Sequence, residues 1–125
     1  DIDFAQTYTH TYGSIANVSK RIIKLANTNL TEVATFESDT QNGAFVRADV
    51  RYIRVTNLDS SDALQVGLDD EDSDAAYTSV AADSSIIFTG TTVEGGNGGS
   101  TLDNATALKV KGAANQQLEV MIASV

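Results

Sequence analysis

The sequence predicts an all-β fold, an antiparallel β-sandwich of the jelly-roll or Greek-key type with about eight to nine short strands. Apolar and polar residues alternate with a period of two along most of the chain. Clusters of Gly, Asn, Asp and Ser separate these segments at a spacing of roughly 8–12 residues, which is typical of antiparallel sandwiches. A chain of 125 residues is long enough to bury one core and short enough to be a single domain.

The first predicted strands come from alternating or β-branched segments. Residues 4–12 alternate Gln6, Tyr8, His10 and Tyr12 on one side with Thr7, Thr9 and Thr11 on the other, and Thr and Tyr suit a pleated, half-buried surface. Residues 15–25 form a second extended run, with apolar residues among three basic ones. A helix over residues 18–26 is the alternative, which the β-branched residues and the lack of a capping box disfavour. A third strand is predicted over residues 30–36, followed by a polar turn.

The middle of the chain carries the strongest strand signal. Residues 45–56 are apolar on both faces, a pattern that favours a central position in a sheet. Residues 64–68 alternate cleanly, so Leu64, Val66 and Leu68 are expected to face the core.

The last part of the chain adds short strands over residues 75–80, 84–89, 108–112 and 118–125. Leu108 and Val110 are expected to face inward. The glycine-rich segment 90–101 is predicted to be a flexible loop. Segments 54–68 and 109–122 each place a polar turn between two alternating strands, and we interpret them as two similar β-hairpins.

The predicted domain organisation is one β-sandwich over residues 13–125, preceded by an N-terminal arm or edge strand over residues 1–12. The chain contains no proline. Edge strands therefore cannot be protected by proline, and they must be charged, covered or paired with another chain.

Composition excludes several classes of function. The net charge of −9 argues against a nucleic-acid partner, which would need clustered Lys and Arg. The absence of cysteine excludes disulfides and thiolate chemistry. No apolar run approaches the ~18 residues needed to cross a bilayer, so no membrane partner is expected, and the N-terminus does not resemble a signal peptide.

The charges are unevenly distributed. The acidic residues between Val55 and Leu108 have no basic neighbours in sequence. Six of the eight basic residues come earlier in the chain: Lys20, Arg21, Lys24, Arg47, Arg51 and Arg54. This asymmetry suggests faces or ends of opposite sign, which would suit head-to-tail or subunit-to-lattice contacts; a merely solvated surface is the alternative.

No residue pattern predicts catalysis, and no catalytic, cofactor-binding or metal-binding residue is predicted. The acidic run 69–74 lacks the sixth-position glycine and the closing glutamate of a calcium loop, so a solvated loop is expected there. His10 is the only histidine and lies in the Thr/Tyr-rich segment, outside any nucleophile motif. The Gly95–Gly99 segment is not followed by the Lys-Ser/Thr pair of a phosphate-binding loop.

Three segments from Tyr52 onward carry a family resemblance: YIRVTNLDSSDALQVGL, AYTSVAADSSIIF and ALKVKGAANQQLEVMIASV. They resemble the small β-sandwich virion proteins of tailed bacteriophages, although Ala82 stands where a glycine is usual. The resemblance implies a non-enzymatic capsid decoration (cement) protein or head-tail accessory protein on the capsid surface. Its partners would be the major capsid protein or other virion proteins, and trimers would match three-fold points of the lattice.

Two alternatives belong to other classes. A receptor- or carbohydrate-binding tail module would present an exposed aromatic cluster, for example Tyr8, Tyr12 and Tyr77. A subunit of an extracellular β-rich filament would exchange or add strands through its N-terminal segment.

Overall fold

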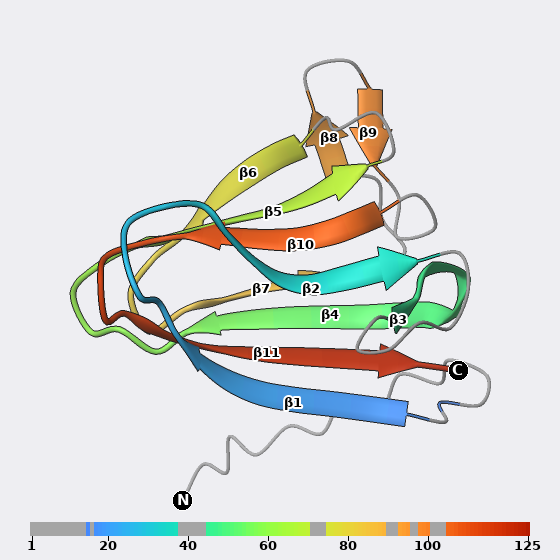
Figure 1. The fold of residues 1–125 in the computed structure, drawn as a ribbon, viewed down its shortest axis with the longest axis horizontal. Helices are drawn as coiled ribbons and strands as arrows, with labels where there is room; N and C mark the ends of the chain where they lie inside the picture. Colours follow the sequence, from blue (N-terminus) through green and yellow to red (C-terminus); the bar gives the residue numbers. More distant parts are fainter. Residues whose placement is uncertain are drawn as a thin grey trace, which may run out of the picture.

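The chain folds into two β-sheets packed face to face (Figure 1). The computed structural model describes residues 15, 17–37, 45–70, 75–89, 93–95, 98–100 and 105–125. These residues contain no α-helix and one short 3-10 turn, η1 (Arg47–Asp49). The strands are β1 (Asn17–Lys24), β2 (Thr31–Glu37), β3 (Phe45–Val46), β4 (Val50–Asn57), β5 (Leu64–Asp70), β6 (Ala75–Val80), β7 (Ser85–Phe88), β8 (Val93–Gly95), β9 (Gly98–Ser100), β10 (Ala105–Lys111) and β11 (Gln117–Ser124).

The topology is that of a jelly roll. Sheet A has the order β1-β11-β4-β7, and sheet B has the order β3-β2-β10-β5-β6. The antiparallel pairs β1/β11, β2/β10, β4/β7 and β5/β6 are those obtained when one long folded ribbon is wrapped around a core. The predicted all-β sandwich is therefore confirmed, with nine strands in the two large sheets and a separate two-stranded pair, β8-β9.

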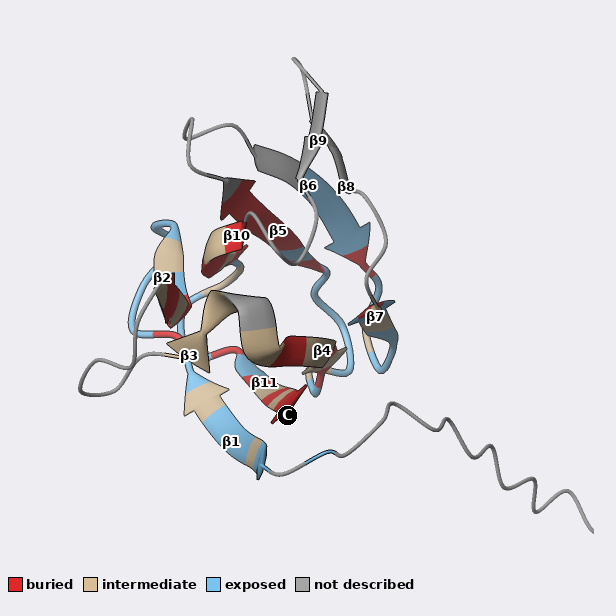
Figure 2. Ribbon diagram, turned by 90° about the vertical axis from the view of Figure 1, so that its right-hand side faces the viewer, coloured by how far each residue is buried: buried red, intermediate tan, exposed pale blue. Residues whose placement is uncertain are grey.

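The core lies between the sheets and is built by alternation. In β5, Leu64, Val66 and Leu68 are fully buried, as predicted, and Leu108 and Val110 of β10 are buried beside them. Figure 2 shows buried residues on β4, β5, β10 and β11, whereas β1 is coloured mostly as exposed. The interior strands thus supply the core, and β1 contributes little to it.

The prediction of one strand over residues 45–56 is wrong. β3 pairs in parallel with the end of β2 in sheet B, and η1 then carries the chain across to β4 in sheet A. The Phe45 ring lies against Phe36, with ring centroids 6.0 Å apart, which holds β3 in the other sheet. The two apolar faces therefore reflect two short strands in different sheets. β4 itself does lie between β11 and β7, as the prediction of a central strand required.

The prediction of two hairpins is also wrong. β4 and β5 belong to different sheets, and so do β10 and β11. Each segment is an arch that crosses the core, and the two arches lie side by side because β4 pairs with β11 and β5 with β10. Alternation shows which side chains face the core, but it does not show which strand is the neighbour.

Other predictions are corrected locally or lie outside the described residues. Asp69 and Asp70 belong to β5 rather than to a solvated loop, and residues 71–74 lie outside the described residues. The glycine-rich segment 90–101 contains the β8-β9 hairpin instead of a continuous loop. The predicted arm over residues 1–12 also lies outside the described part of the chain.

Candidate assembly surface

Four arches gather at one end of the sandwich, on the left in Figure 1. They connect β1 to β2, β4 to β5, β6 to β7 and β10 to β11, and we call this the arch end. Two of them turn through residues with positive φ, Asp83 at 57° and Asn115 at 67°. Asp and Asn tolerate this left-handed conformation better than most residues with a side chain.

A buried polar network built on Asn57 and Gln116 joins the arches. The Gln116 Nε2 atom donates to Asn57 Oδ1 at 3.0 Å and to the carbonyl of Asp62 at 3.1 Å. The Asn57 Nδ2 atom donates to the same Asp62 carbonyl at 2.8 Å and to the carbonyl of Val80 at 3.2 Å. Gln116 Oε1 accepts from the backbone N–H of Ala113 at 2.7 Å. Both side chains are almost completely buried, so these hydrogen bonds replace the water that the amides lose.

The same network anchors the end of β1. The backbone N–H of Leu25 donates to the carbonyl of Gln116 at 2.9 Å, and Asn115 N–H donates to the carbonyl of Leu25 at 2.8 Å. The backbone polar groups of Leu25 therefore point toward β11. Because these groups alternate in direction along a strand, those of Val18, Lys20, Ile22 and Lys24 point away from β11, toward the open edge.

The open edge of β1 is exposed, and it carries apolar side chains. Val18 is 62% exposed and Ile22 is 66% exposed. No described strand pairs with β1 on this side. An edge with open backbone groups and exposed β-branched residues is a template for pairing with another chain.

Arg21 ties β1 to the opposite sheet. Its guanidinium donates to the carbonyl of Val33 in β2. Val33 has no cross-strand partner, because the register of β2 with β10 shifts at that position. Arg21 therefore donates to a backbone carbonyl at a β-bulge and links β1 of sheet A to β2 of sheet B.

The outer face of sheet A joins β1 to the rest of that sheet. Glu119 on β11 lies 3.7 Å from the Lys20 ammonium and 3.1 Å from the Arg54 guanidinium. The Arg54 guanidinium also contacts Met121 Sδ at 3.7 Å. The Arg54 Nε atom is buried and has no hydrogen-bond partner among the described residues. This face holds the basic residues Lys20, Lys24 and Arg54 against one acidic residue, although the whole chain carries a charge of −9.

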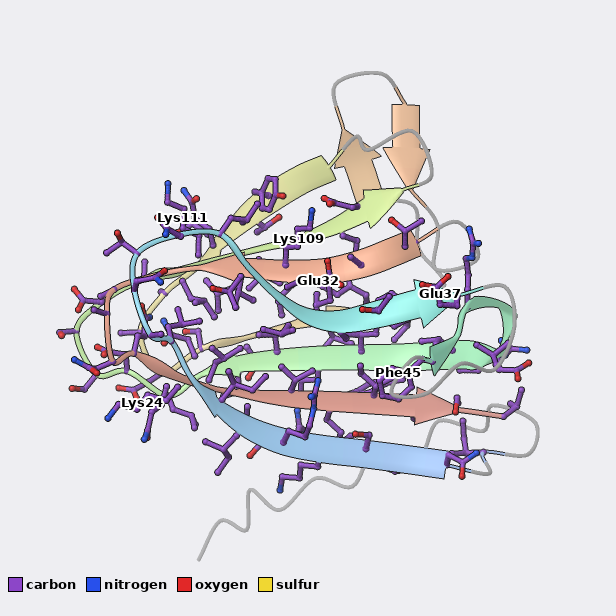
Figure 3. All side chains as sticks on the ribbon, viewed as in Figure 1. Lys24, Glu32, Glu37, Phe45, Lys109 and Lys111 are labelled. Carbon is purple, nitrogen blue, oxygen red and sulfur yellow. The ribbon has the colours of Figure 1, made fainter. Side chains whose placement is uncertain are left out.

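Acidic residues cluster on the side of the arch end next to β7. Asp83 precedes β7, and its backbone N–H donates to the carbonyl of Asp59 at 3.0 Å. The Asp59 carboxylate accepts from the backbone N–H groups of Asp62 and Ser61, both at 2.8 Å, and these bonds lower the pKa of Asp59 below its ordinary 3.8. Lys24, labelled in Figure 3, ends the opposite edge strand at the same end of the molecule. The two edges of sheet A thus differ in sign at the arch end.

A second charged cluster lies on the outer face of sheet B. Lys109 on β10 forms an ion pair with Asp69 on β5, and the Tyr77 hydroxyl on β6 donates to Asp69 at 3.3 Å (Figure 3 shows Lys109). The hydrogen bond to Asp69 raises the pKa of Lys109. Burial and then the Asp69 charge raise the pKa of Tyr77. These groups link three strands, β5, β6 and β10, through one ion pair and one hydrogen bond.

The residues singled out from the sequence are described only in part. His10, Tyr8 and Tyr12 lie outside the described residues, so the aromatic cluster is represented only by Tyr77, which is 42% exposed. In the described part of the chain, no three His, Asp or Glu residues group as ligands for a metal ion. No helix there is long and apolar enough to cross a bilayer.

Sequence reasoning missed the two residues that organise the arch end. Asn57 and Gln116 each lie in a polar turn of the two similar segments, where such residues are ordinary. The similarity of the two segments could have indicated these residues, because each segment has an amide side chain where a strand meets its turn.

Comparisons with known proteins identify a similar fold. No family model matches the sequence, and no curated protein matches it. Among solved structures, a chain from the Bacillus endospore appendages, which are described as a novel family of disulfide-linked pili, is similar over 97% of this chain and 98% of its own length. The TM-score is 0.52 and the sequence identity is 14%, so the likeness concerns the β-sandwich fold alone.

Proposed function

We propose that this chain is a non-catalytic structural subunit that joins copies of itself into an extended β-rich filament. The observation that carries the proposal is the open edge of β1, where Val18 and Ile22 are exposed beside backbone groups that pair with no described strand. Pairing with another strand would satisfy those backbone groups and place cross-strand neighbours beside the two side chains.

The geometry of sheet A supports growth in one direction. Its strands β1, β11, β4 and β7 are successively antiparallel, so the two edge strands run in opposite directions. A copy placed beside another in the same orientation can therefore pair β1 with the neighbour's β7 and continue one antiparallel sheet. If the rotation between successive copies is one that closes a ring, such a head-to-tail contact gives a ring. Any other rotation gives a filament.

The charges favour the same arrangement. Lys24 on one edge would approach Asp59 and Asp83 beside the other edge of the next copy. Opposite charges at this point steer association and are weakened by salt. The structurally similar appendage protein is described as a disulfide-linked pilus component, whereas this chain has no cysteine, so contacts among its copies would be non-covalent.

An edge proline tests the proposal. Lys20→Pro removes a backbone N–H that points to the open edge and leaves the pairing of β1 with β11 intact, a position where proline is tolerated. Lys20→Ala is the matched control, because it removes the same side chain and keeps the N–H. Wild type and Lys20→Ala are expected to form filaments in negative-stain electron microscopy, and Lys20→Pro is expected to form none while keeping the wild-type far-ultraviolet circular dichroism spectrum.

Two results would count against the proposal. Wild-type protein that sediments as a single small species at every soluble concentration would reject the filament. Lys20→Pro protein that forms filaments as readily as Lys20→Ala would reject pairing at the β1 edge, because the lysines of β1 would then only protect an edge that never pairs.

Capsid decoration is the second candidate, favoured by the resemblance of residues 52–125 to phage virion proteins. In that case the exposed surfaces described above would meet a capsid lattice rather than further copies of the chain. Cryo-electron microscopy of the source particle distinguishes the two. Capsid-symmetric copies on a head would support decoration, and a helical array of the chain would support the filament.

A further inference from the structure

Four of the seven exposed large apolar residues in the described part of the chain share one face. The seven are Ile15, Val18, Ile22, Leu30, Leu58, Tyr77 and Ile87. The strand register places four of these seven, Val18, Ile22, Leu58 and Ile87, on the outer side of sheet A, as the next paragraph derives. Exposed apolar residues that share one face mark an interaction site more often than residues scattered over a whole surface do.

The register gives the position of each residue. Ile22 lies opposite Glu119, and Val18, four residues earlier on β1, lies on the same side of the sheet. Ile87 lies opposite Arg54, which itself lies opposite Met121. Glu119 and Met121 alternate with the buried residues of β11 and so lie on the outer side of the sheet. Leu58 continues β4 past the buried Asn57, and its N–H donates to the carbonyl of Gln117, so its side chain lies on the same outer side.

The charges at the arch end of sheet A are ordered from one edge to the other. Lys24 ends β1, and Asp59 and Asp83 lie in the arches beside β7. Consider a two-fold axis that runs parallel to the strands, above the outer face and over the line midway between β11 and β4. Rotation about this axis places β1 of one copy over β7 of the other and keeps both arch ends at the same end of the dimer. Lys24 of each copy would then face the acidic corner of its partner, so the face is complementary to itself.

We propose that the outer face of sheet A packs against the same face of a second copy in an isologous contact. Sheets packed face to face lie about 10 Å apart with their strands about 30° from parallel, which suits side chains of this size. The outer face of sheet B offers no equivalent, because Tyr77 is its one exposed large apolar residue in the described part of the chain and the Lys109–Asp69 pair lies beside it. This face-to-face contact is separate from the β1–β7 edge pairing proposed for the filament, and it can form without that pairing.

The test uses the Lys20→Pro variant, in which the edge contact is blocked. This protein is expected to sediment as a dimer in analytical ultracentrifugation. Adding Ile87→Lys places a charge in the apolar face and is expected to raise the dimer dissociation constant by at least about tenfold, since each dimer loses two buried isoleucine side chains. Leu30→Lys is the matched control: Leu30 is 46% exposed, against 52% for Ile87, and lies in the β1–β2 arch away from the face.

Cross-linking gives a second readout, because the chain has no cysteine of its own. Thr56 lies on the outer side of sheet A near the proposed axis, and Thr35 lies on the outer side of sheet B. With a short bis-maleimide reagent, Thr56→Cys is expected to give covalent dimers and Thr35→Cys is expected to give none beyond random collision.

The outcomes separate the two proposals. Because Lys20→Pro also removes a lysine from this face, the Thr56→Cys cross-link is made in the wild-type background as well. A monomeric Lys20→Pro protein together with no Thr56→Cys dimers in either background overturns the face contact and leaves the filament standing. Equal weakening by Ile87→Lys and Leu30→Lys also overturns it. Wild-type protein that stops at face-linked dimers and never forms filaments overturns the filament and supports the face contact.

Discussion

Gly112 and Gln116 provide a direct test of the packing at the arch end. A Cβ atom on Gly112 would lie 2.2 Å from Gln116 Oε1, 3.0 Å from Gln116 Cδ and 3.1 Å from Leu25 Cδ1. Gln116 is only 1% exposed, and its amide is held by Asn57 and by backbone groups, so it cannot swing away. Gly112→Ala should therefore lower the free energy of unfolding by about 1–3 kcal/mol, the usual cost of overpacking.

The second perturbation, Gln116→Ala, removes the obstructing atoms and the hydrogen bonds together. It leaves Ala113 N–H without its acceptor and Asn57 Oδ1 without its Gln116 donor. Loss of these buried bonds should cost about 2–4 kcal/mol. In this background the Gly112 methyl group meets only Leu25 Cδ1 closely, so the added cost of Gly112→Ala should fall below about 1 kcal/mol.

The assay is urea unfolding of the four proteins of this cycle, followed by far-ultraviolet circular dichroism. In a chain of this size each kcal/mol corresponds to roughly 3–5 °C in melting temperature, so thermal melts serve as a check. The interaction energy between the two sites should be about 1–2 kcal/mol in the direction of rescue. Additive costs would refute the reasoning, because they would mean that Gln116 does not occupy the space beside Gly112 in the folded protein.

Three further predictions concern the core and the charged groups. Leu108→Ala, at a fully buried position of β10, should lower the free energy of unfolding by about 2–5 kcal/mol. Ile87→Ala, at an exposed position, should change it by less than about 0.5 kcal/mol in monomeric protein. The midpoints of urea unfolding compare the two variants. Above pH 10 the protein should lose stability as the pH rises, because Lys109 and Tyr77 have raised pKa values in the folded protein and the unfolded chain releases their protons first. Asp69→Asn should flatten this dependence of the urea midpoint on pH. An unchanged slope would contradict the role of Asp69. The lowered pKa of Asp59 stabilises the folded protein at pH values above the ordinary pKa of 3.8, and this stabilisation is lost as the pH falls through the folded-state pKa. The Asp59→Asn variant should therefore lose less stability between pH 5 and pH 2 than the wild type does. The difference should correspond to the contribution of one carboxyl group.

The sequence predicted the local structure better than the connections between strands. The alternation in Leu64, Val66 and Leu68 requires one buried face, so that strand and its orientation were predictable. Alternation contains no information on the neighbouring strand, and β4–β5 was therefore interpreted as a hairpin although it crosses between sheets. The register of β4 with β11 depends on contacts between residues more than 60 positions apart, for example the Arg54–Glu119 pair, and no short-range pattern encodes it.

The candidate surface was predictable in outline only. The absence of proline indicated that edges must be charged, covered or paired, and β1 is indeed charged at Lys20 and Lys24. The sequence did not show that Val18 and Ile22 would be exposed, because the same β-branched residues in an interior strand would have been core. Only the position of β1 at the end of the sheet, with β11 on one side and no described strand on the other, distinguishes the two cases.

The arch-end network and the proposed edge contact are physically linked. Gln116 fixes β1 through its own backbone carbonyl, which accepts from Leu25, while its side chain is held by Asn57. An edge strand that is anchored at one end loses less conformational freedom when a second chain pairs with it, so the affinity of the edge contact should depend on residues that never touch the neighbour. Gln116→Ala should therefore weaken assembly by more than its distance from the open edge suggests, even at temperatures where the variant remains folded. If assembly were unaffected in folded Gln116→Ala protein, the pairing at β1 would not depend on this anchor, and Arg21 and the β11 register alone would hold the strand in place.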